Sequence, residues 1–296
     1  MLEVPLKNDF EYDVIIPVAK RECTFVPRVI KYIRKNLIGA QIIYLLTDKK
    51  NIHYLDSCIN GKDCVFVDED KLIDGLTLEI IGSYLKAKGS YDKQGWFMQQ
   101  FLKMGFALSP LCGDYYLSWD ADTLPLSHIR FWNDGHPLFT KKKEYYPSYF
   151  KTIQRLLGLN KIEHYSFIAE HMLFKRTVMK DLVNKIGGSS VEGNNWMQKI
   201  INACDFENKL EPQFSEFETY GTFCSYYYPE LYKVRQLNTF RRAGLIKGRN
   251  ISDKLLENLS FDLDIASFEF SDIPFFDVNI RHFWYRIQRR LVYFHR

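Results

Sequence analysis

Short apolar runs alternate with segments of helical periodicity over the first seventy residues, and this alternation constrains the fold more than any other feature. Residues 12–18 (YDVIIPV), 41–48 (QIIYLLTD) and 63–70 (DCVFVDED) have the apolar character of buried strands. Residues 25–37 carry apolar side chains at helical spacing and are followed by a glycine that ends the pattern. Strands that alternate with helices predict an α/β fold with a mostly parallel sheet flanked by helices.

Two aspartates, Asp120 and Asp122, follow a further apolar run, DYYLSW. Side chains two residues apart in an extended segment point to the same side, so both carboxylates can face one ligand. Ligands of open α/β sheets bind at the C-terminal ends of the strands, where this pair would lie. Two adjacent carboxylates suit Mg²⁺ or Mn²⁺, which complete their coordination with phosphate oxygens and water. A solvated acidic turn is the alternative interpretation.

The composition excludes some classes of protein. The chain has 40 basic and 36 acidic residues. This near balance of charge gives no general polyanion-binding signature, so we expect no nucleic-acid partner. The six cysteines lack metal-binding spacings, which favours free thiols in a reducing compartment. The N-terminal residues do not resemble a signal peptide, and no apolar run reaches the length of about 18 residues that spans a membrane. We therefore expect a cytoplasmic protein.

The segment GWFMQQFLKM predicts a helix on which several polar residues share one face. Trp96, Gln99, Gln100 and Lys103 lie near one another at spacings of three and four. The glutamines could hydrogen-bond a sugar or a pyrophosphate, and Lys103 could offset phosphate charge. The alternative is an amphipathic helix with its glutamines on the surface, and for Trp96 and Phe101 we expect simple core packing.

Two further segments carry candidate catalytic side chains. In SFIAEHMLFKR, Glu170 and His171 lie between apolar runs, which is costly unless partners or a site compensate for it. His171 could bind a metal ion or the acceptor, and Glu170 could hold an acceptor hydroxyl or act as a base; a structural histidine is the alternative. In SEFETYGTF, either Glu216 or Glu218 could be a general base. Ser215 and Glu218 also match a helix capping box.

Taken in order, these segments resemble the GT-A glycosyltransferases, which act on nucleotide-sugars and bind a metal-diphosphate through a D-x-D motif. The matching pieces are YDVIIPVAKR, IIYLLTD and WDADTLP. A closer resemblance is to a bacterial group of uncharacterised GT-A-like proteins, the DUF6492 type, through GWFMQQFLKMGFA, LSWDADTLPL, AEHMLFKR and SEFETYGTF. The resemblance implies a catalytic, nucleotide-sugar-binding GT-A domain over residues 1–232 and a C-terminal helical extension over residues 233–296.

The resemblance also implies roles for single residues. Three residues at the end of the first strand would contact the nucleotide: Pro17, Val18 and Ala19. Asp48 would reach the base or the ribose, Asp120 the ribose or the metal, and Asp122 would be the direct metal ligand. The glutamine Gln100 and the lysine Lys103 would also belong to the donor site. An ordinary strand terminator at Pro17 and a helix or turn cap at Asp48 are the alternatives.

The activity implied is a metal-dependent transfer of a sugar from a nucleotide diphosphate donor to a hydroxyl of a cell-surface glycan or glycolipid, such as lipopolysaccharide or capsule. Mn²⁺ or Mg²⁺ would be the cofactor, and Glu170, Glu216 or Glu218 would take the acceptor proton. A sugar nucleotidyltransferase is an alternative, although such enzymes usually carry a glycine-rich loop after the first strand and VAKRECTFVP has no glycine. A non-catalytic glycan-binding module is another.

The C-terminal segment NIRHFWYRIQRRLVYFHR mixes arginines with aromatic and aliphatic residues. This pattern is typical of a helix that lies on an anionic membrane surface. We therefore expect that residues 233–296 could include a peripheral contact with the inner face of the cell membrane. A C-terminal helix that docks on the domain, with its arginines solvated, is the alternative.

Overall fold

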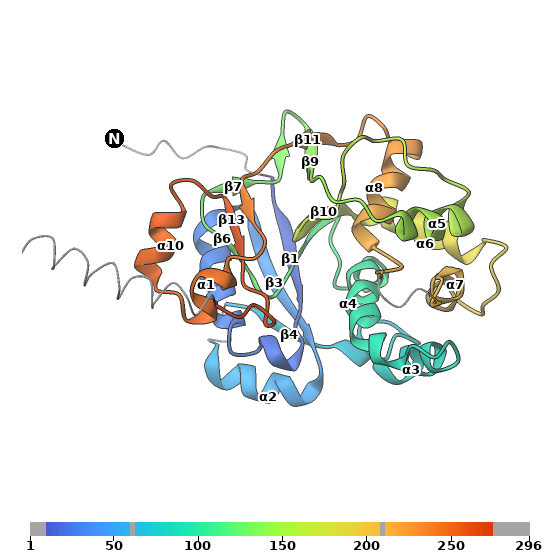
Figure 1. The fold of residues 1–296 in the computed structure, drawn as a ribbon, viewed down its shortest axis with the longest axis horizontal. Coiled ribbons are helices and arrows are strands. Elements are labelled where there is room, and N and C mark those ends of the chain that lie inside the picture. The colour runs from blue at the N-terminus through green and yellow to red at the C-terminus, as the bar shows by residue number, and fades with distance from the viewer. Residues whose placement is uncertain (1–9, 60–62, 208–210, 275–296) are drawn as a thin grey trace, which may run out of the picture.

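The computed structural model describes residues 10–59, 63–207 and 211–274, and at its centre lies a five-stranded sheet in the order β10-β5-β1-β3-β4 (Figure 1). These strands are β1 (Tyr12–Pro17), β3 (Ala40–Thr47), β4 (Val65–Asp68), β5 (Tyr115–Trp119) and β10 (His171–Lys175). β1, β3, β4 and β5 are parallel, whereas β10 pairs with β5 in the antiparallel direction. The predicted α/β fold with a mostly parallel sheet is confirmed.

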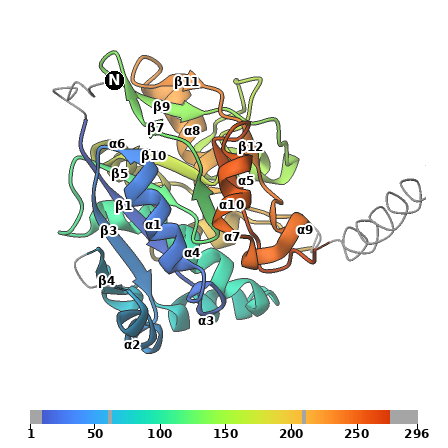
Figure 2. The same ribbon diagram turned by 90° about the vertical axis from the view of Figure 1, so that its left-hand side faces the viewer.

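Helices cover both faces of this sheet (Figures 1 and 2). The helices are α1 (Val26–Asn36), α2 (Lys49–Cys58), α3 (Leu78–Lys86), α4 (Gln94–Gly105), α5 (Pro147–Leu157), α6 (Arg176–Gly187), α7 (Trp196–Ala203), α8 (Glu216–Tyr227), α9 (Gly244–Lys247) and α10 (Asp253–Leu259). The short strands are β2 (Leu37–Ile38), β6 (Thr123–Pro125), β7 (Ile129–Arg130), β8 (Trp132–Asn133), β9 (His136–Thr140), β11 (Lys233–Arg235), β12 (Thr239–Phe240) and β13 (Ile265–Ser267). In Figure 1, α1 and α10 lie on one side of the sheet, and α4, α6 and α8 lie on the other.

Each face of the sheet has its own hydrophobic core, which explains why three successive residues of β1, Val14, Ile15 and Ile16, are all apolar. Val14 and Ile16 point into a core shared with α1, whereas Ile15 points into a second core shared with α4 and α6. Successive side chains of a strand face opposite sides, so a strand with helices on both faces needs apolar residues at every position. The apolar runs in the sequence are therefore a direct consequence of the two-sided burial.

The described part of the chain after residue 232 packs onto the body that precedes it. β11 runs parallel to β9, and β13 pairs in the antiparallel direction with β6, the strand that follows the D-x-D motif. Ala243, Ile251 and Phe268 are buried in the same core as α1. This packing brings the residues that follow β13 close to the two aspartates.

The C-terminal extension, which we expected to be helical, contains the strands β11, β12 and β13 as well as α9 and α10 within the described residues. Residues 275–296, where the sequence suggests a membrane-surface helix, lie outside the described residues, so that expectation stays a prediction. None of the helices in the described ranges combines the length and the apolar character that crossing a bilayer requires.

Candidate functional site

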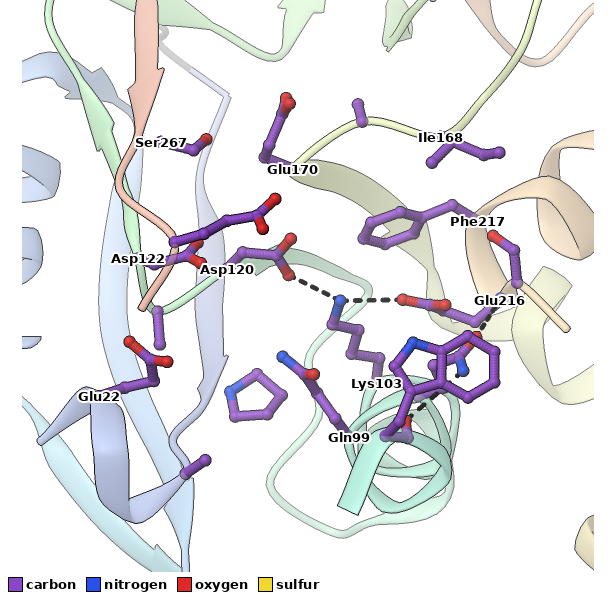
Figure 3. Close-up of a pocket in the computed structure, with 18 of the residues that line it drawn as sticks. Glu22, Gln99, Lys103, Asp120, Asp122, Ile168, Glu170, Glu216, Phe217 and Ser267 are labelled. Atoms are coloured by element: carbon purple, nitrogen blue, oxygen red, sulfur yellow. Dashed lines mark hydrogen bonds and ion pairs between the residues drawn. The ribbon is translucent and has the colours of Figure 1, made fainter. Parts of the chain in front are cut away.

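A cleft of about 390 Å³ lies at the C-terminal ends of β1 and β5 (Figure 3). Pro17 is the last residue of β1, and Asp120 and Asp122 directly follow β5. One face of α4 and the first turn of α8 form the opposite wall. The strand ends are where an open α/β sheet binds its ligands, and the structure brings the predicted D-x-D motif to this edge.

The D-x-D loop forms backbone hydrogen bonds with the segment before β10 on one side and with the segment after β13 on the other. The N–H of Asp120 donates to the carbonyl of Glu170 at 3.0 Å, beside β10, and the N–H of Phe268 donates to the carbonyl of Asp122 at 2.8 Å, beside β13. The hydroxyl of Thr123 also donates to Asp122 Oδ1 at 3.2 Å. Burial raises the pKa of Asp122 to about 7, and the charge of Asp120 adds to this effect.

Lys103 bridges two carboxylates that come from distant parts of the chain. Its Nζ lies 2.8 Å from Asp120 Oδ1 and 2.9 Å from Glu216 Oε1, as the dashed lines in Figure 3 show. Nζ also lies 4.4 Å from the centre of the Phe217 ring. Burial alone would lower the pKa of Lys103, but the two carboxylates outweigh it and raise the pKa above its ordinary value. The lysine charge is thus already matched, so Lys103 holds Asp120 and Glu216 rather than serving as the free phosphate cation that we expected.

Gln100 and Glu216 meet where α4 packs against the start of α8. Gln100 is 4% exposed, and its Oε1 accepts a hydrogen bond from the N–H of Glu216 at 3.2 Å. This N–H belongs to the first turn of a helix, where backbone donors have no partner within the helix. Gln100 therefore lines the cleft but uses its side-chain oxygen to support α8, whereas Gln99 points toward the cleft from the same helix (Figure 3).

Glu170 lines the cleft and has a partly buried basic partner, Lys142. The Nζ of Lys142 lies 3.1 Å from Glu170 Oε2 and 3.2 Å from Oε1, and it also donates to the hydroxyl of Thr239. The glutamate is 4% exposed. The cost of burying this charged group is therefore offset by the ion pair.

Glu218 does not reach the cleft. From the sequence, Glu216 and Glu218 were equally good candidates for the general base. Its carboxylate accepts from Lys161 Nζ at 2.5 Å, from the hydroxyl of Ser166 at 3.0 Å and from the N–H of Phe167 at 2.9 Å. The side chain is fully buried. The N-cap part of the predicted capping box is present, since Ser215 Oγ accepts from the N–H of Glu218 at 3.2 Å. Glu218 thus connects α8 to the loop that contains Lys161, Ser166 and Phe167. Its assignment as a catalytic base is corrected.

His171 likewise lies behind the cleft and not in it. Its Nε2 is 2.9 Å from the hydroxyl of Thr140, and Arg235 Nε donates to that same hydroxyl at 3.2 Å. His171 Nε2 is therefore engaged with Thr140, whichever of the two groups donates. Burial, followed by the charges of Arg235 and Lys142, holds the pKa of His171 well below its usual range. The ring stacks on Trp119 with centroids 5.1 Å apart, so the suggested metal-ligand role is corrected to a structural one.

A second cavity of about 580 Å³ adjoins the cleft. Val18 and Asp48 line it, and Pro17 and Ala19 line both cavities. Asp48 caps α2 by accepting from the N–H of Lys50 at 2.6 Å, so the capping role and the position at a cavity occur together. The four residues predicted to contact a nucleotide are thus gathered at one place.

Glu69, beside Asp48 in the second cavity, predicts a measurable pH dependence. Burial raises its pKa from 4.5 to about 7, and the charges of Asp70 and Asp48 add to this. The folded protein then binds a proton that the unfolded chain has lost, so the contribution of Glu69 to the free energy of unfolding falls as the pH rises from 4.5 to 7. Urea unfolding at pH 5 and pH 8 should show a smaller pH dependence for Glu69→Gln than for the unchanged protein; equal dependences would contradict the shift.

The sequence interpretation missed several cleft residues. Trp96, which we expected in the core, is 36% exposed and lines both cavities, whereas Phe101 is buried as expected. The residues missed from the C-terminal part of the chain are Arg241, Ser267, Glu269, Phe270 and Ser271. Only the pairing of β13 with β6 brings them here, and no local pattern signals such a pairing. The exposure of Trp96 could have been predicted from the sequence, because Phe97 and Phe101 already fill the apolar face of α4.

The charges of the cleft do not balance. The acidic cleft residues and acidic ion-pair partners are Glu22, Asp120, Asp122, Glu144, Glu170, Glu216 and Glu269, and the basic ones are Arg21, Lys103, Lys142, Arg241 and Arg249. With every carboxyl group ionised, the seven carboxylates exceed the five basic groups by two negative charges. Among the described residues, no basic group lies within ion-pair distance of Asp122. The unmatched charge is therefore centred on the D-x-D motif.

No set of three or more histidine, cysteine, aspartate or glutamate side chains within the described ranges forms a metal centre. A cation at this site would have Asp120 and Asp122 as its protein ligands and would take its other ligands from a bound molecule and water. Mg²⁺ is commonly held in this way, by one or two carboxylates together with substrate phosphates.

The model of a family described as "Family of unknown function (DUF6492)" matches residues 27–243. The chain belongs to this family. The resemblance that the ordered segments showed is thereby confirmed at the level of the family. No curated protein matches the chain.

This DUF6492 member is similar to several solved structures. Mouse xyloside xylosyltransferase 1, in its apo form, is 12% identical, with 90% of this chain and 100% of that chain covered and a TM-score of 0.43. The galactosyltransferase LgtC, in complex with donor and acceptor sugar analogues, is 10% identical, with 86% of each chain covered and a TM-score of 0.41. The bifunctional glycosyltransferase WbbM, also apo, is 12% identical, with 92% of this chain and 47% of that chain covered and a TM-score of 0.43. Likenesses this distant carry no conclusion about activity.

Proposed function

We propose that this protein is a metal-dependent GT-A glycosyltransferase that moves a sugar from a nucleotide diphosphate donor to a hydroxyl of a cell-surface glycan or glycolipid. The observation that carries the proposal is the position of Asp122. It is a carboxylate without an ion pair among the described residues, it lies beside Asp120, and its cleft adjoins a cavity large enough for a nucleoside.

The residues of the D-x-D motif fit a divalent cation. The cleft carries two unmatched negative charges, which one Mn²⁺ or Mg²⁺ would balance. Since Lys103 occupies Asp120 Oδ1, Asp122 and the second oxygen of Asp120 are the groups that would hold the ion. When bound, a divalent ion stabilises the charge that develops on a leaving diphosphate.

The two cavities suit the two ends of a nucleotide-sugar. The second cavity, with Val18 and Asp48, would take the nucleoside, and the cleft would take the sugar and the acceptor. The diphosphate would cross between them past Ala19 and Gln99, which line both. This arrangement directs the reacting end of the donor toward Asp122.

The acceptor proton would pass to a carboxylate of the cleft if the reaction is inverting. Glu216 and Glu170 are the candidates that remain, and each is held by a lysine, Lys103 or Lys142. Removing a general base costs about 10²–10⁴-fold in rate. Of Glu216→Gln and Glu170→Gln, the variant that loses the base should lower kcat by that factor with little change in donor affinity, measured by steady-state kinetics with saturating acceptor. If neither variant lowers kcat, neither glutamate acts as the base.

The structure offers less for the alternative of a sugar nucleotidyltransferase. β1 leads through Val18 and Ala19 directly into a short 3₁₀ helix (Lys20–Glu22), without a glycine-rich loop for a triphosphate. A non-catalytic glycan-binding module would not need an unpaired aspartate beside a second carboxylate. The cytoplasmic location and the contact of residues 275–296 with a membrane surface stay predictions.

Donor turnover tests the proposal. The full chain would be incubated with UDP-, GDP-, ADP- and dTDP-sugars, and the release of nucleoside diphosphate would be measured with Mn²⁺, with Mg²⁺ and with EDTA. We expect release from one nucleotide class, dependent on the divalent ion. Absence of release and of binding for every donor would overturn the proposal, and binding without release would favour a glycan-binding or nucleotide-binding module.

A further inference from the structure

Trp96 stands at the boundary between the cleft and the second cavity. It belongs to the first turn of α4 and, together with Pro17, Ala19, Arg21 and Gln99, lines both cavities. A molecule that occupies both cavities must therefore pass this side chain. In Figure 3, Gln99 and Lys103 of the same helix extend toward the D-x-D aspartates.

The packing of Trp96 leaves one side of its indole open. The ring of Phe97 meets it edge to face, with centroids 5.0 Å apart, and Phe97 itself is fully buried in the core. Trp96 is 36% exposed. Exposed large aromatic side chains at a cavity are typical of ligand contacts, since they offer a wide apolar surface and a polar end.

We propose that Trp96 is the platform on which the sugar ring of the donor rests, an inference that depends on the proposed function. Of the three parts of a nucleotide-sugar, the diphosphate is charged and belongs with the cation at Asp122. The nucleoside fits the second cavity, which Val18, Leu78, Met98 and Leu102 make largely apolar. Because the diphosphate joins the nucleoside to the sugar, the sugar enters the cleft, which Trp96 also lines. One face of a pyranose consists of C–H groups that pack on an indole.

The polar neighbours of Trp96 suit the hydroxyl groups of such a ring. Gln99 follows Trp96 by three residues on α4, so both side chains lie on the same face of the helix. Its amide can donate and accept hydrogen bonds at once. Trp96 therefore acts as a specificity-determining residue that distinguishes a nucleotide-sugar from the free nucleotide.

The test compares affinities for a nucleoside diphosphate and for its nucleotide-sugar, using the pair that the donor panel identifies, for example UDP and UDP-glucose. Calorimetric titrations in Mn²⁺ would use the full chain and the variants Trp96→Ala, Trp96→Leu and Trp96→Phe. We expect Trp96→Ala and Trp96→Leu to weaken the nucleotide-sugar by about tenfold and to leave the nucleoside diphosphate unchanged, as truncation of a central aromatic contact commonly costs a factor of this size. Trp96→Phe, which keeps a flat ring, should recover most of the loss.

Tyr54→Ala serves as the matched control, because Tyr54 is 46% exposed on α2 and lines neither cavity. It should bind both ligands as the unchanged protein does. Equal weakening of both ligands by Trp96→Ala would show that the indole contacts the nucleoside and would overturn the inference, as would no effect on either. If the unchanged protein binds no nucleotide-sugar at all, the proposed function itself fails, and this outcome is distinct from the other two.

Discussion

Replacing Asp122 with asparagine is expected to lower donor turnover by about 10³-fold or more, because a divalent ion supplies several kcal/mol of transition-state stabilisation and each 1.36 kcal/mol is a factor of ten. Asparagine keeps the shape of the side chain and removes the charge that would bind the ion. The carboxylate of Asp122 accepts one hydrogen bond, from Thr123, and has its pKa raised by burial and by Asp120. Asp122→Asn should therefore unfold at an equal or higher urea concentration.

Loss of activity without loss of stability is thus the expected signature of Asp122→Asn. Asp74→Asn is the control, since Asp74 is exposed and lines neither cavity. It should retain full turnover. A variant Asp122→Asn that turns over the donor at the original rate would contradict the assignment of this residue to the metal-diphosphate site.

Replacing Lys103 with methionine is expected to destabilise the protein by about 3 kcal/mol, the range found when one partner of a buried ion pair is removed. Methionine fills a similar volume, but Asp120 and Glu216 would then face each other without the cation that lies 2.8 and 2.9 Å from them. Urea unfolding measures the loss. The double variant Lys103→Met with Glu216→Gln should recover part of it, since it removes one of the two uncompensated charges.

Lys71→Met is the matched control for Lys103→Met. The Nζ of Lys71 lies 3.6 Å from Asp68 Oδ2, and its side chain is 74% exposed, so the loss should stay below about 1 kcal/mol. Similar losses for the two lysines, or no recovery in the double variant, would show that Lys103 does not position the two carboxylates.

The parts of the fold that follow from local patterns could be predicted from the sequence. The apolar runs of β1 and β3 report burial on both faces of the sheet, and burial of this kind leaves few other options. The D-x-D motif could be placed at the end of β5 for the same reason. Ser215 was recognised as a helix cap, because capping depends on residues three apart in the chain.

The features that depend on packing between distant segments could not be predicted. Glu216 and Glu218 are two residues apart at the start of α8, and two residues on a helix face different directions. Which of them reaches the cleft depends on where α4 places Lys103 and where the loop after α5 places Lys161. No sequence pattern contains that information.

The same limit applied to His171, which the sequence showed beside Glu170. Glu170 precedes β10 and lines the cleft, whereas His171, the first residue of β10, pairs with Trp119 of β5 and stacks on its ring.

The central claim is that Asp122 and a divalent ion together bind the diphosphate of a nucleotide donor. Calorimetric titration of the full chain with UDP, GDP, ADP and dTDP, in Mn²⁺ and in EDTA, tests it most directly, with Asp122→Asn measured alongside. The account predicts that one nucleoside diphosphate binds in Mn²⁺, and that both EDTA and Asp122→Asn abolish this binding. A nucleoside diphosphate that binds equally well in EDTA, or equally well to Asp122→Asn, would contradict it.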